Sequence, residues 1–87
     1  MRTLKVFVLT EQNHADHETS LEVSVYSTKT AAKQVLLQRK DEILERFKEE
    51  CGSEWEVYEN KPTFWGISST DDDVWTELLI TETEVKS

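Results

Sequence analysis

The chain has 87 residues, enough for one domain and too few for two, so we treat residues 1–87 as a single domain. Eighteen acidic against ten basic side chains give a net charge of −8, which argues against direct nonspecific binding to nucleic acid. No apolar run approaches the roughly 20 residues of a membrane span, so no membrane partner is expected. The lone Cys51 excludes an internal disulfide, and the N-terminus lacks a signal-peptide cleavage site; both features predict a cytoplasmic protein.

The first third of the chain predicts two antiparallel strands joined by a loop. Residues 3–10 (TLKVFVLT) are apolar on both faces, which is typical of a central strand that is covered on both sides. Its two faces carry Leu4, Val6 and Val8 on one side and Phe7 and Leu9 on the other. Residues 11–19 are polar and predict a loop. Residues 20–27 alternate between apolar and polar, which predicts a half-buried strand with Tyr26 on its outer face.

An amphipathic helix follows over residues 31–50. Ser27 or Thr28 is a suitable N-cap, and Gly52 stands where a residue with positive φ ends a helix. At about 100° per residue, one arc of the helix is apolar and the opposite arc is acidic or amidic. The apolar arc contains Ala32, Leu36, Leu37, Ile43, Leu44, Phe47 and Cys51.

The remaining residues predict a β-meander. Residues 54–60 and 63–69 form two short strands around the turn at Lys61-Pro62. Residues 74–85 follow Thr70 and three acidic residues, a pattern that suits the start of a helix, but they are rich in β-formers and end in strict alternation, so we favour a strand.

The predicted fold is therefore α+β: an antiparallel sheet of about five strands, in the order β-β-α-β-β-β, with one amphipathic helix packed on one face. The strand directions favour the order 2-1-5-4-3, which makes every neighbouring pair antiparallel and keeps the first strand internal. A sheet with the third strand beside the first also satisfies antiparallel pairing.

The pattern between Lys5 and Lys33 resembles a group of small uncharacterised proteins from phages, mobile elements and gut bacteria. The shared features are VFVLT, a polar loop, EVSVYST and an Ala-Ala-Lys helix start, followed by tails like WEVYEN and LLITETEV. The resemblance spans most of the chain and implies a fold. It implies no activity, and no functional residue is transferred from it.

The sequence offers no convincing catalytic or metal site. His14, Asp16, His17 and Glu18 lie together in the predicted loop, and imidazole and carboxylate groups are good ligands for zinc or nickel. A structural site needs four ligands at characteristic spacings, so we expect no metal and no cofactor. There is no nucleophile elbow and no glycine-rich phosphate loop, which leaves an enzymatic function without support.

Negative charge is concentrated at the C-terminal end of the chain. Residues 1–27 carry a net charge of −2, residues 28–51 carry +1, and residues 52–87 carry −7. The acidic patch that results is formed by Glu54, Glu56, Glu59, Asp71, Asp72 and Asp73. The three adjacent aspartates do not have the spacing of a calcium loop, so a solvated acidic loop is the simpler interpretation.

Strand alternation places large apolar side chains on the sheet face away from the helix. This predicted interaction face contains Phe7, Leu9, Tyr26, Tyr58, Trp75 and Leu79. So much uncovered aromatic surface usually marks a partner site. The alternative is an error in the alternation, for example a bulge that turns Trp75 inward.

The leading functional hypothesis is a non-enzymatic interaction module that forms a homodimer, or binds another protein, through this face. One alternative is an acidic decoy or inhibitor of the anti-defence type, which would imitate nucleic-acid phosphates and occupy a basic partner's groove. A second alternative is a small metal-binding protein that uses the loop at residues 14–18.

Overall fold

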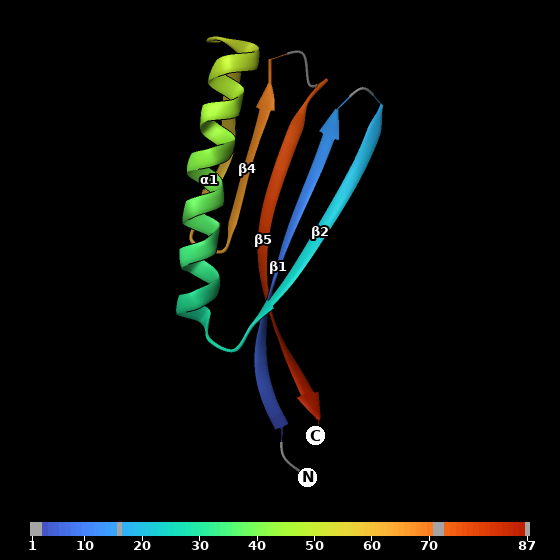
Figure 1. The fold of residues 1–87 in the computed structure, drawn as a ribbon, viewed down its shortest axis with the longest axis vertical. Coiled ribbons are helices and arrows are strands. Elements are labelled where there is room, and N and C mark those ends of the chain that lie inside the picture. Colours follow the sequence, from blue (N-terminus) through green and yellow to red (C-terminus); the bar gives the residue numbers. More distant parts are fainter. Residues whose placement is uncertain (1–2, 16, 71–72, 87) are drawn as a thin grey trace.

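The computed structural model describes residues 3–15, 17–70 and 73–86, in which five strands form one sheet and one helix packs against it (Figure 1). The elements in chain order are β1 (Thr3–Ala15), β2 (Glu18–Tyr26), α1 (Lys29–Cys51), β3 (Trp55–Lys61), β4 (Phe64–Ser69) and β5 (Trp75–Lys86). The predicted α+β class and the β-β-α-β-β-β order are confirmed. No helix in this part of the chain is long and apolar enough to cross a bilayer.

The sheet has the strand order β2-β1-β5-β4-β3, and every neighbouring pair is antiparallel. This is the predicted order, and the alternative with β3 beside β1 is wrong. The C-terminal residues form a strand because they pair along both edges, with β1 on one side and β4 on the other. The β-formers of this segment outweigh the helix-start pattern of the acidic residues that precede it in the sequence.

The polar loop predicted for residues 11–19 is wrong. β1 continues to Ala15 and β2 begins at Glu18, so the connection is a tight turn. His17 in this turn has a φ of 66°, in the left-handed region that hairpin turns require. Polar residues continue the two strands here because strands pair through backbone hydrogen bonds. The polarity of the side chains decides only which face of the sheet contacts water.

Helix α1 begins two residues before and ends one residue after the predicted range of 31–50, and it lies between the predicted caps. The Thr28 hydroxyl accepts a hydrogen bond from the Ala31 backbone N–H at 3.1 Å, which makes Thr28 the N-cap. Gly52 follows the helix with a φ of 62°, which a residue without a Cβ adopts without strain. Leu37 departs from the prediction, since it lies at the edge of the apolar arc and is 55% exposed.

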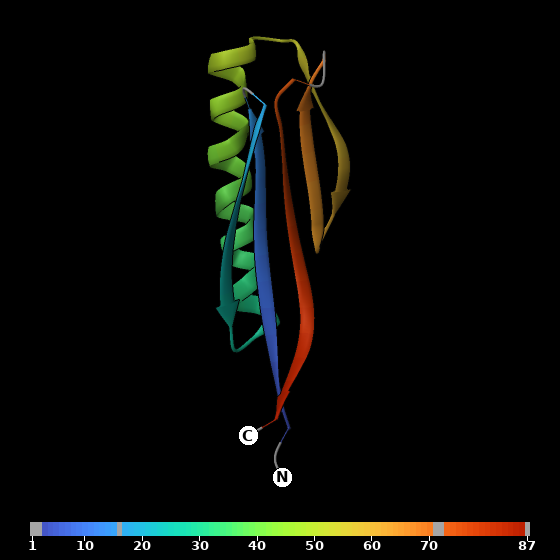
Figure 2. The same ribbon diagram turned by 90° about the vertical axis from the view of Figure 1, so that its right-hand side faces the viewer.

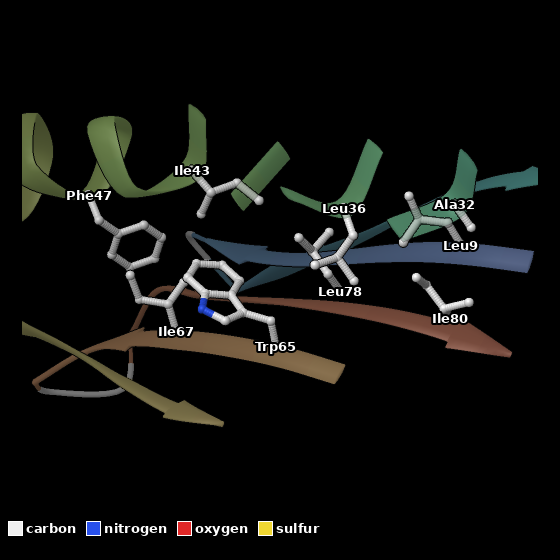
Figure 3. Close-up of a cluster of buried hydrophobic side chains, with 9 residues drawn as sticks. All are labelled: Leu9, Ala32, Leu36, Ile43, Phe47, Trp65, Ile67, Leu78 and Ile80. Atoms are coloured by element: carbon white, nitrogen blue, oxygen red, sulfur yellow. The ribbon is translucent and has the colours of Figure 1, made fainter. Parts of the chain in front are cut away.

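The hydrophobic core lies between α1 and one face of the sheet (Figure 3). The helix contributes Ala32, Leu36, Ile43 and Phe47, as predicted. The strands contribute Leu9 from β1, Trp65 and Ile67 from β4, and Leu78 and Ile80 from β5. The core is small, as expected for a chain of this length.

The helix covers one face of the sheet, and no described element lies over the other face (Figures 1 and 2). Beyond the helix, residues 3–6 of β1 pair with residues 83–86 of β5 as a two-stranded ribbon. This ribbon extends beyond the ends of β2 and β4, so the molecule is elongated, with extents of 51 × 24 × 16 Å. The uncovered face therefore forms a long surface.

The packing of the helix against the core can be tested by the effect of two helix substitutions on the free energy of unfolding. Phe47→Ala removes an aromatic ring that is 1% exposed, and it should lower the free energy of unfolding by about 3–5 kcal/mol. Gln38→Ala, on the exposed side of the same helix, is the control and should change it by less than about 0.5 kcal/mol. Urea unfolding followed by circular dichroism measures both. Equal losses of stability would show that the helix packs through a different face.

Candidate functional site

The pairing register of β1 and β5 decides which side chains share a face of the sheet. Leu9 stands opposite Ile80, and both are buried beneath the helix. Thr10 stands opposite Leu79 on the other face. Because side chains alternate along a strand, this one register assigns every side chain of both strands to the covered face or to the open face.

Three residues of the predicted interaction face lie on the wrong side of the sheet. Leu9 is 4% exposed and belongs to the core, and Phe7 and Tyr26 pack against that core as a cross-strand pair. The sequence does not fix the orientation of β1 because this strand is apolar on both faces. The structure places the pair Phe7 and Tyr26 beneath the helix, where both side chains lose most contact with water. The smaller pair, Val8 and Val25, lies on the open face.

The other three predicted residues, Tyr58, Trp75 and Leu79, do lie on the open face. Leu79 is 41% exposed beside Thr10, and Trp75 pairs with His14. The alternative of a bulge that turns Trp75 inward is wrong, because β5 pairs regularly at Trp75, whereas a bulge occurs in β3 between Val57 and Glu59.

The open face contains an apolar patch that strand alternation misassigned. We define the apolar patch as Val8, Leu21, Val23, Val25 and Leu79. Pairing of β1 with both β2 and β5 makes it contiguous: Val25 stands beside Val8, and Val23 is separated from Leu79 by Thr10 alone. The three β2 residues are 57–61% exposed. The expectation that the apolar side of β2 is buried is therefore wrong, because alternation shows that one side of the strand is apolar but not on which side the helix lies.

A pocket lies on the same face, near the hairpin end of the sheet. It has a volume of about 410 Å³ and is lined by Glu56, Tyr58, Ser68, Trp75 and Glu77, from β3, β4 and β5. We call it the aromatic–acidic pocket. Its lining combines the aromatic rings of Tyr58 and Trp75 with the carboxylates of Glu56 and Glu77.

The pocket depends on a bulge and a glycine. The register shift between Val57 and Glu59 leaves Tyr58 as an extra residue in β3, and the Tyr58 ring packs against β4 at Gly66. A Cβ at Gly66 would lie 2.6 Å from this ring, so only glycine allows the approach. The Tyr58 hydroxyl donates a hydrogen bond of 2.6 Å to Glu77 Oε1, which fixes both side chains at the edge of the pocket.

The histidines of the predicted loop lie on different segments of the hairpin. His14 lies on β1, His17 lies in the turn, and Glu18 begins β2. The His14 ring stacks on Trp75, with ring centroids 5.4 Å apart and planes 11° from parallel. His14 Nδ1 also lies 2.9 Å from the Thr19 hydroxyl. Asp16 lies outside the described residues. Among the residues that the structure does describe, no three His, Cys, Asp or Glu side chains are grouped so that they could hold a metal ion.

The described acids of the predicted acidic patch have different surroundings. Glu56 lines the aromatic–acidic pocket, whereas Glu59 forms an ion pair with Lys61 at 3.0 Å. Glu54 and Asp73 line a separate cavity at the C-terminal end of α1. Asp71 and Asp72 lie outside the described residues. Glu56 and Glu59 stand opposite Ser68 and Gly66, so these two acids share the open face along β3.

Sequence reasoning missed a buried ion pair beneath the helix. Glu11, expected in a loop, is 6% exposed on β1. Its two carboxylate oxygens accept hydrogen bonds from Arg39 Nε at 2.7 Å and Arg39 Nη2 at 2.8 Å, a bidentate arrangement. Arg39 also pairs with Glu42 on the helix surface. Glu11 and Arg39 are 28 residues apart, so no local spacing in the sequence indicates the pair.

Further hydrogen bonds extend this pair toward the hairpin. Asn13 Nδ2 donates to Glu11 at 2.9 Å, and the fully buried Thr76 hydroxyl donates to Asn13 Oδ1 at 2.7 Å. Arg46 donates to the Thr76 hydroxyl at 2.9 Å. Hydrogen bonding to Arg39 lowers the pKa of the Glu11 carboxyl, although burial alone would raise it. The network ties the helix to β1 and β5 on the side away from the open face.

No protein-family model matches the chain, and neither the curated proteins nor the solved structures contain a significantly similar protein.

The Glu11–Arg39 pair predicts an acid-dependent loss of stability. Glu11→Gln should lower the free energy of unfolding at pH 7 by about 1.5–3 kcal/mol, the range for hydrogen bonds to charged groups. The folded-state pKa lies below the ordinary value of 4.5, so the pair stabilises the fold fully above that pH and loses its effect as the pH falls below it.

Urea unfolding of the wild type and Glu11→Gln between pH 7 and pH 3 measures this effect. The difference between the two proteins should shrink below about pH 4.5. Glu18→Gln, at an exposed position of β2, is the matched control and should behave like the wild type. A difference that is the same at both ends of the range would refute the assignment.

Proposed function

We propose that the chain is a non-enzymatic protein-interaction module that forms a homodimer through the open face of its sheet. The observation that carries this proposal is the apolar patch. Leu21, Val23 and Val25 stand side by side on β2 and expose 57–61% of their surfaces on a face that no described element covers. Contiguous exposed apolar surface of this kind usually marks an interaction site.

The proposed contact is between faces and not between sheet edges. β2 is an edge strand, so two copies could also join through their free backbone groups. Side chains stand perpendicular to a sheet, however, so joining at the edge would leave Val23 and its neighbours exposed to water. Packing of face on face, about 10 Å apart, buries them directly.

A second copy is the occupant that fits best. A two-fold axis brings the same patch against itself, and the patch contains no charged side chain that would need a counterpart. From Phe7 to His14 on β1, the strands β2, β1 and β5 lie side by side over about 24 by 10 Å, on the order of 240 Å² of sheet plane. A specific interface buries a total of about 1,000 Å², so the dimer contact must also include the neighbouring ribbon of residues 3–6 and 83–86.

The dimer proposal predicts the effect of one added charge. Val23→Glu places a carboxylate at the centre of the patch and should convert a wild-type dimer, present at micromolar concentration, into a folded monomer. Gln38→Glu adds the same charge on the exposed side of α1 and should leave the dimer intact. Sedimentation velocity measures the state of assembly, and circular dichroism confirms folding. A wild type that stays monomeric at high concentration would exclude the proposal.

Salt separates this proposal from the acidic-decoy alternative. Two copies, each with a net charge of −8, repel one another, so screening by added salt should strengthen an apolar dimer. A decoy that occupies a basic groove should lose affinity with salt. Glu59 is paired with Lys61, and Glu54 and Glu56 line different pockets, so these acids support the decoy less than the apolar patch supports the dimer.

A further inference from the structure

The aromatic–acidic pocket has a composition that selects its ligand by charge. Tyr58 and Trp75 supply aromatic rings, and Glu56 and Glu77 supply negative charge. The face of an aromatic ring attracts cations through its quadrupole, most strongly for tryptophan. An anionic ligand would meet two carboxylates in a chain that already carries a net charge of −8. The pocket therefore favours a cation.

We propose that this pocket binds an alkylated ammonium group, of the kind found in choline-like small molecules and in methylated lysine side chains. Its volume of about 410 Å³ lies within the range of about 300–1,000 Å³ that is typical of small-molecule sites. Alkyl groups on the nitrogen can pack against the Tyr58 and Trp75 rings while the charge is balanced by carboxylates. This proposal is independent of the dimer.

Two alternative cations fit the site less well. A divalent metal ion needs several oxygen or nitrogen ligands, and the described residues contain no group of three suitable side chains. A bare ammonium ion is strongly hydrated and would need hydrogen-bond acceptors for each N–H, whereas much of the lining is aromatic. An alkylated nitrogen makes no such demand, because its charge is spread over groups that donate no strong hydrogen bonds.

The surrounding structure holds the pocket in a preformed shape. The hydrogen bond from Tyr58 to Glu77 fixes two lining residues, and Gly66 allows the Tyr58 ring to lie against the sheet. Trp75 is held by its stack on His14. A carboxylate has several lone-pair sites, so Glu77 can accept the tyrosine hydrogen bond and still face a cation. Preorganisation of this kind lowers the entropic cost of binding.

The test uses choline and its neutral isostere 3,3-dimethylbutan-1-ol, titrated into the full chain and followed by calorimetry and NMR. We expect choline to bind about tenfold more tightly than the isostere, with shifts in the Trp75 side chain and the Gly66 amide. The same titration with the Val23→Glu variant measures binding without the dimer contact. Equal affinity for the two compounds, or binding of neither choline nor a trimethyl-lysine peptide, would overturn the proposal.

Variants on one strand locate the site. Glu77→Gln is isosteric and removes one charge, and it should weaken choline binding about fivefold to tenfold; Trp75→Leu should weaken it at least as much. Glu82→Gln, at an exposed position of the same strand, is the matched control and should bind like the wild type. Unchanged binding in a folded Glu77→Gln protein and a folded Trp75→Leu protein would refute the assignment.

A peptide carrying trimethyl-lysine identifies the source of the ammonium group. Tighter binding of this peptide than of choline would indicate a protein side chain, whereas equal or weaker binding would indicate a small molecule. The unmethylated lysine peptide is the control and should bind more weakly than the trimethylated one. Tighter binding of the unmethylated peptide would contradict the requirement for an alkylated nitrogen.

Discussion

Helix α1 packs on one face of the sheet through Ala32, Leu36, Ile43 and Phe47, and the described chain has no second helix for the opposite face. The central strand β1 is nevertheless apolar on both sides. The helix therefore covers one apolar side of β1, whereas no described element covers the other apolar side. The proposed dimer and the proposed cation site both depend on this imbalance, because both use the face that the helix does not cover.

The position of the helix over the sheet is set by polar as well as apolar contacts. The bidentate pair between Glu11 and Arg39 joins β1 to α1, and the hydrogen bonds of Thr76 and Arg46 join α1 to β5. A buried carboxylate is costly unless it is paired, so any arrangement that separated Glu11 from Arg39 would be penalised. Apolar side chains can slide over one another, whereas a bidentate pair fits one geometry only. We infer that the network selects a single orientation of the sheet relative to the helix.

The open face has two chemically distinct regions. The apolar patch extends over β2, β1 and β5 and is uncharged, whereas the aromatic–acidic pocket lies over β3, β4 and β5 and contains two carboxylates. The bulge at Tyr58 and the absence of a side chain at Gly66 create the second region within a regular sheet. Salt should affect the two in opposite directions, since screening relieves repulsion between acidic copies and weakens attraction for a cation.

The sequence by itself determined the class of fold and the buried side of the helix, and it favoured the observed order of the strands without excluding a sheet with β3 beside β1. Helix periodicity identified Leu36 and Phe47 as core residues, because an isolated amphipathic helix has only one apolar side. It did not determine which face of the sheet meets the helix. β1 is apolar on both sides, and a shift of one residue in parity exchanges Leu9 with Val8 at no cost in local pattern. Only the tertiary structure decided this, through cross-strand register, the tight turn at His17, and the pairing of Glu11 with an arginine 28 residues away. These are long-range contacts, and their partners cannot be identified from local spacing.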